Sequence, residues 1–105
     1  MDRVQHLLNL LEEDPRSVFI LFALAKEYEK RQKYEIAEAY YLRSLELDEN
    51  YLGSYYHVAK LYEELGDNDQ ALAMYERGIT KAKILSDFHA LGELMNAKTN
   101  LEMEL

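Results

Sequence analysis

The sequence has no cysteine, no tryptophan, a single proline and only four glycines. The absence of cysteine excludes a disulfide framework and a thiolate zinc site, although it is compatible with either redox compartment. The scarcity of chain breakers, together with abundant Ala, Leu, Glu, Lys and Tyr, favours helices joined by short turns over a sheet with many turns. The composition therefore predicts an all-α fold, and 105 residues are enough for one domain.

Basic residues are also in the minority, because 12 lysines and arginines stand against 20 acidic residues, giving a formal net charge of −8. A surface of this charge repels phosphate backbones and anionic lipid headgroups, so we expect neither nucleic acid nor a membrane as a partner. The first residues lack the basic and apolar regions of a signal peptide, and no apolar run reaches membrane-spanning length. We therefore expect a cytoplasmic protein.

The sequence repeats itself at an offset of 34 residues. Within each copy, apolar and small residues recur at helical spacing in two successive segments, which predicts a hairpin of two amphipathic helices. The eight identities between residues 25–43 and 59–77 are Ala25/Ala59, Lys26/Lys60, Tyr28/Tyr62, Glu29/Glu63, Ala37/Ala71, Ala39/Ala73, Tyr41/Tyr75 and Arg43/Arg77.

One further helix is predicted on each side of the two hairpins, for a total of about six helices. Residues 2–13 form an amphipathic helix equivalent to half a unit, and Ser86 or Asp87 can cap a final helix. The N-terminal stripe consists of Val4, Leu7, Leu8 and Leu11, and the apolar face of the last helix consists of Phe88, Leu91, Leu94, Met95 and Leu101.

Turn and capping residues support this division of the chain. Asp14 followed by Pro15 predicts an N-cap and a first helical residue. In the second hairpin Gly66 predicts a helix stop and Asp67 a new N-cap. The first hairpin has Gln32 at the position of that glycine, so its turn is less well marked.

The pattern resembles the tetratricopeptide repeat family, which implies a right-handed superhelix of antiparallel helical hairpins. On this resemblance the chain is one domain: a half-repeat helix at 2–14, repeats at 18–51 and 52–85, and a capping helix at 86–105. The residues that carry it are Leu24-Ala25, Tyr28, Ala37, Tyr41 and Leu47-Asp48 in the first unit, and Tyr55, Val58-Ala59, Tyr62, Gly66-Asp67, Ala71, Tyr75 and Gly78 in the second.

The resemblance also implies a function, because members of this family bind a peptide or protein segment in a concave groove lined by the first helix of each hairpin. It implies a non-enzymatic interaction module or adaptor and no cofactor. Transferred onto this sequence, the peptide-binding residues are Phe19, Phe22, Lys26, Glu29, Tyr56, His57, Lys60 and Glu63.

The two phenylalanines allow two interpretations, because Leu21, Leu24 and Ala25 suffice for the core of their helix. Phe19 and Phe22 either anchor a ligand or pack against the N-terminal half-repeat. The aligned Lys–Glu pairs that follow them form either a charged ladder along the groove or ordinary solvated ion pairs.

The charge of the groove indicates the partner. One binding mode of the family is a cationic clamp for the C-terminal carboxylate of a chaperone tail, and of the positions that match it only Lys26 is cationic. We therefore expect a basic or apolar peptide as the partner.

Catalysis finds little support, because His6, His57 and His89 fall on three different helices and no Gly-rich phosphate loop occurs. No metal site is predicted. The alternative function is self-assembly into a homodimer through the exposed terminal helices, since the N-terminal stripe lacks the covering layer that a whole repeat would give it.

Overall fold

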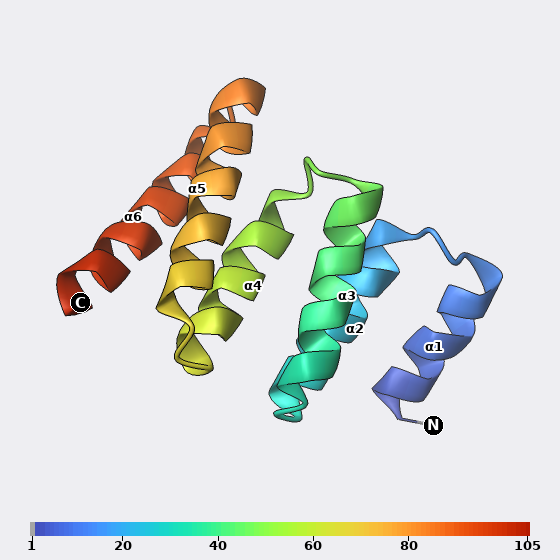
Figure 1. Ribbon diagram of the computed structural model, residues 1–105. Coiled ribbons are helices and arrows are strands. Elements are labelled where there is room, and N and C mark those ends of the chain that lie inside the picture. The colour runs from blue at the N-terminus through green and yellow to red at the C-terminus, as the bar shows by residue number, and fades with distance from the viewer. Residues whose placement is uncertain (1) are drawn as a thin grey trace. The chain divides into compact units, whose positions relative to one another are not determined.

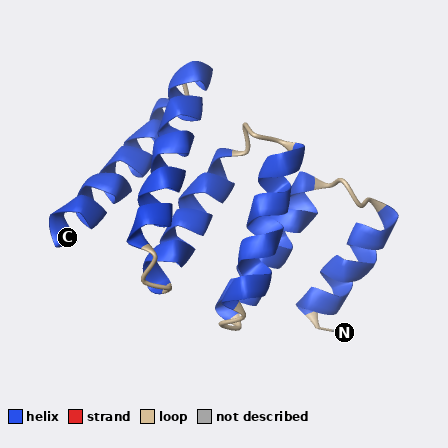
Figure 2. Cartoon of the chain, viewed as in Figure 1, coloured by secondary structure: helices blue, strands red, loops and turns tan. Residues whose placement is uncertain are grey.

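The computed structural model describes residues 2–105, and this range contains six α-helices and no strand (Figures 1 and 2). The all-α class and the six helices predicted from the sequence are confirmed. The chain divides into two compact units, the first unit at Met1–Glu49 and the second unit at Asn50–Leu105. The helices are α1 (Arg3–Glu13), α2 (Val18–Lys30) and α3 (Tyr34–Leu47) in the first unit, and α4 (Leu52–Glu64), α5 (Asn68–Leu85) and α6 (Phe88–Glu104) in the second.

In the first unit, α2 and α3 form an antiparallel hairpin, and α1 packs on α2 (Figure 1). On these two helices Leu21, Leu24 and Tyr41 are fully buried. From α1, Val4 and Leu7 are buried in a cluster with residues of α2, so the predicted stripe of this helix is covered within the unit. The residues of this stripe follow Val4 by three, four and seven positions, which brings their side chains onto one helix face.

In the second unit, α4 and α5 form the equivalent hairpin, and α6 packs on α5 (Figure 1). Gly78 lies at the place where the three helices meet. A Cβ atom added there would lie 2.8 Å from the Cβ of Tyr55 and 3.1 Å from the δ-carbons of Leu94, so the missing side chain lets α5 approach both neighbouring helices.

The two hairpin turns have the same backbone geometry but different residues. Gln32 has a φ of 60° and Gly66 a φ of 77°, so both lie in the left-handed region. The next residue, Lys33 or Asp67, donates its backbone N–H to the carbonyl five residues earlier, at 2.9 Å in both turns. The Asp67 side chain also accepts from the backbone N–H of Gln70, as predicted, whereas Lys33 gives α3 no side-chain cap.

The predicted N-cap at Asp14 is wrong. Asp14 is the C-cap of α1, and the Ser17 side chain caps α2 by accepting from the Ile20 N–H at 3.3 Å. Between them the Ser17 N–H donates to the Asp14 carbonyl at 3.2 Å, which closes a turn with Pro15 at its second position. A fixed φ suits the second position of a turn as well as the first position of a helix, so the sequence pair did not distinguish the two.

The predicted apolar face of the last helix is partly wrong. Leu94 and Leu101 are buried together with Ala97, but the Phe88 side chain is 74% exposed and that of Met95 is 47% exposed. The reason is that α6 packs almost entirely on one neighbour, α5. The apolar stripe of Leu94, Ala97 and Leu101 is covered, and the stripe that carries Phe88 and Met95 is not. Its N-cap is Asp87, one of the two predicted candidates.

Candidate functional site

An aromatic and charged group of side chains joins α2 to α3 in the first unit. The Tyr41 hydroxyl donates a hydrogen bond of 2.6 Å to the Glu29 carboxylate. The Phe22 ring meets the Tyr41 ring edge to face, with centroids 5.8 Å apart and planes at 62°. The Lys26 ammonium lies 5.9 Å from the centroid of the Phe22 ring. Spacings of four and three residues place Phe22, Lys26 and Glu29 on one face of α2.

The same arrangement recurs 34 residues later, between α4 and α5. Tyr75 donates its hydroxyl proton to Glu63, and the Tyr56 ring lies edge to face against Tyr75 with centroids 6.5 Å apart. The Lys60 ammonium lies 5.9 Å from the centroid of the Tyr56 ring, as Lys26 does in the first unit. We call the two groups the first and second aromatic quartets: Phe22, Lys26, Glu29 and Tyr41, and Tyr56, Lys60, Glu63 and Tyr75.

The quartets differ in the salt bridge of the lysine. Lys60 lies 3.9 Å from a carboxylate oxygen of Glu63, which is the predicted pair. Among residues 2–105 the equivalent contact of Lys26 with Glu29 does not form, so the predicted pair is present in the second unit alone. A partly exposed pair of this kind contributes only a few tenths of a kcal/mol.

The two tyrosines are held in the protonated state. Burial raises the pKa of Tyr41 far above its ordinary value, and its hydrogen bond to the Glu29 carboxylate raises it further. Burial and the Glu63 carboxylate raise the pKa of Tyr75 in the same way. Each tyrosine therefore acts as a fixed donor, and each carboxylate keeps free lone pairs for a second donor.

Six of the eight predicted site residues belong to the aromatic quartets. Of the other two, Phe19 lies three residues before Phe22, on the first turn of α2, and is 68% exposed. The half-buried His57 packs its ring against Tyr56 with centroids 5.3 Å apart. The cluster that packs α1 on α2 is formed by Val4, Leu7, Ala23 and Leu24 with partly buried neighbours, and it includes neither Phe19 nor Phe22. The ligand-anchor interpretation of Phe19 and Phe22 stays a prediction.

The buried half of each quartet was not predicted as part of the site. Tyr41 and Tyr75 carry the family resemblance and are fully buried, but their hydroxyl bonds to Glu29 and Glu63 were not foreseen. A signal was present, because the glutamates and the tyrosines recur as aligned pairs with the same separation of 12 residues.

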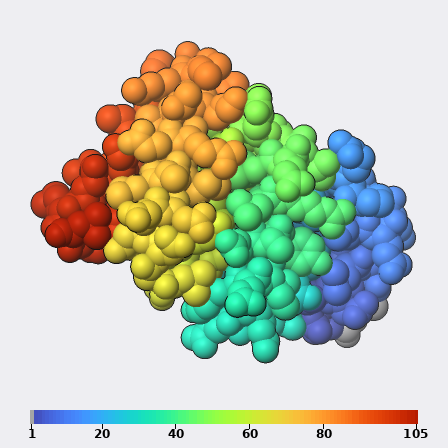
Figure 3. Space-filling model, in the orientation of Figure 1, coloured from blue at the N-terminus to red at the C-terminus, as the bar shows by residue number. Residues whose placement is uncertain are grey.

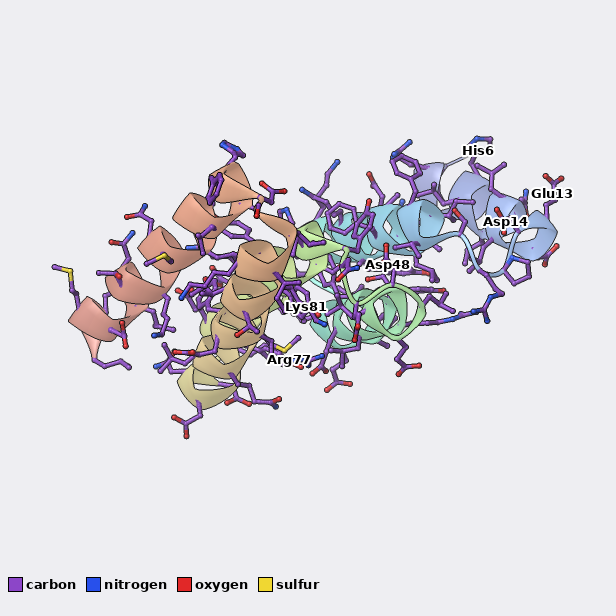
Figure 4. All side chains as sticks on the ribbon, turned by 90° about the horizontal axis from the view of Figure 1, so that it is seen from above. His6, Glu13, Asp14, Asp48, Arg77 and Lys81 are labelled. Atoms are coloured by element: carbon purple, nitrogen blue, oxygen red, sulfur yellow. The ribbon has the colours of Figure 1, made fainter. Side chains whose placement is uncertain are left out.

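The structure brings no histidine cluster together within the part of the chain that it describes. His6 is exposed near the start of α1, away from Glu13 and Asp14 at the other end of that helix (Figure 4), and His89 pairs with Glu93 at 3.2 Å. Within the range 2–105, no group of three or more potential ligands is close enough to hold a metal ion. None of the described helices is both long and apolar enough to cross a bilayer.

Two cavities lie on other surfaces. One of about 420 Å³ is lined by α3 alone, and one of about 190 Å³ lies between α5 and α6. Neither contains a predicted site residue. The lining residues are Glu35, Ile36, Ala39, Tyr40 and Arg43 for the first, and Glu76, Ile79, Lys83, Met95, Lys98 and Thr99 for the second.

Two helical hairpins with the same internal contacts at a period of 34 residues define a helical repeat protein. The tetratricopeptide repeat model matches the sequence twice, at residues 20–51 and 52–80. The chain belongs to the tetratricopeptide repeat family, as the sequence resemblance predicted, and repeats of this family commonly serve as protein–protein interaction modules.

Solved structures agree with this assignment. The crystal structure of a tetratricopeptide repeat domain protein from Salinibacter ruber is 37% identical, covers 82% of this chain and 96% of its own, and superimposes with a TM-score of 0.76. A solution structure from the same organism is 38% identical, with coverages of 85% and 90% and a TM-score of 0.80. No curated protein matches the sequence.

A third solved structure resembles the chain in fold alone. The TPR2B-domain:pHsp70 complex of yeast Sti1 is 16% identical to this chain, covers 97% of it and 82% of its own length, and has a TM-score of 0.89.

Proposed function

We propose that this protein is a non-enzymatic adaptor that binds a peptide or protein segment on the exposed faces of α2 and α4. The observation that carries the proposal is the recurrence of the aromatic quartet in both hairpins. A face that serves packing alone does not require an aromatic ring, an ammonium and a carboxylate at the same three positions. The contact residues are Phe19, Phe22, Lys26, Glu29, Tyr56, His57, Lys60 and Glu63, and we propose that they line a concave groove.

The chemistry of the quartets supports a basic or apolar segment as the ligand. Each glutamate is oriented by its tyrosine and retains acceptor sites for a lysine or arginine of the ligand. The exposed ring of Phe19 and the half-buried rings of Phe22 and Tyr56 offer apolar contact. The net charge of −8 attracts a basic segment before contact.

The fold supports an adaptor role, because the TPR2B-domain:pHsp70 complex of yeast Sti1 and the complex of PcrH with the chaperone binding region of PopD have the same fold. We propose that the present chain likewise acts by holding a partner. The single domain with repeats at 18–51 and 52–85 and the cytoplasmic location remain predictions.

The experiment compares partners recovered by affinity purification and mass spectrometry from the cells that make the protein. A variant with Phe19→Asp and Lys60→Glu changes both faces at exposed or half-exposed side chains. The control is Met103→Asp, because Met103 is 80% exposed and lies on the last turn of α6. We expect the wild type and the control to recover a common partner that the variant loses.

The partner recovered in this way is then divided into synthetic peptides for titration calorimetry. The proposal predicts that the binding peptide is basic or apolar and that added salt weakens the binding of a basic one. Equal recovery of all partners by the three proteins, with unchanged circular dichroism, would contradict a role of α2 and α4.

Self-association into a homodimer is the second candidate function. The exposed side chains of Phe88, Met95 and Met103 on α6 favour it, since large exposed apolar residues commonly lie in interfaces. The stripe of α1 no longer supports it, because Val4 and Leu7 are buried on α2.

A further inference from the structure

The end of the second unit where α5 turns into α6 exposes three large apolar side chains. Ile84 is 69% exposed, Leu85 is 43% exposed and Phe88 is 74% exposed, and all three fall within five residues. Ser86 lies between them with a left-handed φ of 55°, which turns the chain so that both helix ends contribute. This end appears in orange in the space-filling view (Figure 3). Exposed apolar clusters of this kind mark interaction sites.

The same end is basic although the chain as a whole is acidic. Residues 77–89 contain Arg77, Lys81 and Lys83 but a single acidic residue, Asp87, so their net charge is +2. Arg77 and Lys81 are one turn apart on α5 (Figure 4), and the exposed Lys83 makes no salt bridge with any residue of the described range. We call residues 77–89 the basic corner.

The first unit has a turn of opposite character between α1 and α2. Residues 12–19 contain three consecutive acidic side chains and one arginine, so their net charge is −2. Glu12, Glu13 and Asp14 are exposed, and within residues 2–105 none of them makes a salt bridge. Figure 4 shows Glu13 and Asp14 at the end of α1. Phe19, which is 68% exposed, adds an apolar contact. We call residues 12–19 the acidic corner.

We propose that the basic corner is a docking site for the acidic corner of a second copy of this chain. The two corners carry equal and opposite net charges, and each adds exposed apolar side chains, Ile84 and Phe88 on one and Phe19 on the other. Charge complementarity of this kind selects a partner and its orientation, while the apolar contacts hold it. The proposal specifies the geometry of the self-association that is the second candidate function, and it rests on that function.

The proposed contact joins two different surfaces, so it is heterologous. A heterologous contact leaves one free corner at each end of a dimer, and further copies can add until a ring closes. The corners are small, and contacts that bury less than about 1,200 Å² are weak and transient. Association is therefore expected at concentrations of about 0.1 mM and above, with a size that continues to rise beyond the dimer.

The experiment is sedimentation velocity on the full chain from about 10 μM to about 1 mM in about 0.1 M salt, where charges further apart than about 10 Å are screened. We expect Lys83→Glu, which makes the basic corner neutral, and Glu13→Lys, which makes the acidic corner neutral, each to weaken association about tenfold. An equimolar mixture of the two variants is expected to regain association, because the unchanged basic corner of Glu13→Lys meets the unchanged acidic corner of Lys83→Glu.

Two control variants have the same net charge as the test variants but change neither corner. Lys33→Glu matches Lys83→Glu, and Glu104→Lys matches Glu13→Lys, and both control residues are exposed. We expect the controls to associate as the wild type does. Equal loss in the controls would mean that net charge alone governs association, which would overturn the proposal.

Four further outcomes would also overturn it. A mixture that fails to regain association excludes pairing of the corners. If the wild type and both variants form dimers and nothing larger, the interface is symmetric, and self-association itself still holds. A wild type that stays monomeric at all concentrations contradicts both the pairing of the corners and self-association as a function. Binding of the monomer to vesicles of anionic lipid, abolished by Lys83→Glu, would assign the basic corner to a membrane surface instead.

Discussion

The two hairpins of this protein use one backbone geometry and one set of tertiary contacts with different local residues. In the second hairpin Gly66 and Asp67 suit the turn, since glycine adopts a positive φ without strain and aspartate caps α5. In the first hairpin Gln32 adopts the same left-handed conformation, and Lys33 gives no cap. The packing of the two helices therefore determines the turn, and the turn residues only change its stability.

The largest effect is expected where the hairpins differ in the core, at Gly78 and its equivalent in the first unit, Ser44. Gly78→Ser would bring a Cβ within 2.8 Å of the Tyr55 Cβ, so α4 and α5 would have to separate. We expect the free energy of unfolding to fall by about 2–3 kcal/mol, as overpacking of a core commonly costs. The measurement is urea denaturation followed by circular dichroism.

The matched control is Ser44→Gly, which puts the residue of the second unit into the first. It removes the hydrogen bond of 2.6 Å from the Ser44 hydroxyl to the Tyr41 carbonyl and leaves a small void, so about 1–2 kcal/mol is expected. An unchanged midpoint for Gly78→Ser would show that α5 does not need the close approach.

A smaller effect on the free energy of unfolding at neutral pH is expected at Tyr41 and Tyr75, which occupy equivalent positions in the two hairpins. This effect depends strongly on pH. The unfolded chain loses a tyrosine proton near pH 10, whereas the raised pKa of Tyr41 and Tyr75 keeps both protons on the folded chain above that pH. Their contribution is thus complete below about pH 10 and is lost as pH rises, by about 1.4 kcal/mol per pH unit for each tyrosine.

This contribution is measured by chemical denaturation between about pH 8 and pH 11. The variant with Tyr41→Phe and Tyr75→Phe should lose about 1 kcal/mol per tyrosine at neutral pH and show a shallower decline above pH 10. If the wild type and the variant decline in parallel, the two hydroxyls do not stay protonated in the folded chain.

The smallest effect is expected at the first turn. Gln32→Gly removes the cost of a left-handed conformation in a residue with a side chain, so we expect a gain of about 1 kcal/mol in the free energy of unfolding. The reverse change, Gly66→Gln, should lose about as much. Thermal or urea unfolding of both variants checks the pair, and a loss in both would mean that Gln32 makes a contact that outweighs its strain.

Local signals in the sequence were sufficient for most of the fold. The caps at Asp67 and Asp87 and the stop at Gly66 involve residues a few positions apart, so the sequence displays them directly. Asp14-Pro15 was misread because the same pair fits a turn. Phe88 and Met95 were misplaced because the sequence of α6 contains two apolar stripes, and its pattern does not say which one a neighbour covers.

The candidate site was predictable as a face but not as a contact network. The family resemblance assigned Phe22, Lys26 and Glu29 to the groove, and their spacings of four and three residues fit one face of a helix. The bond from Tyr41 to Glu29 joins two helices, and its length depends on how closely those helices pack. The sequence reports only that both residues recur.

The hydrogen bonds of the Tyr41 and Tyr75 hydroxyls also make these side chains unreactive toward reagents that modify tyrosine. Reagents that nitrate or iodinate tyrosine attack the phenolate, and burial with a neighbouring carboxylate keeps that form from arising in either residue. Half-buried tyrosines elsewhere in the chain, such as Tyr34 and Tyr51, will take up the label first. Labelling at Tyr41 then records each opening of the first hairpin and labelling at Tyr75 each opening of the second, so a mass spectrum taken over time reads the two openings separately.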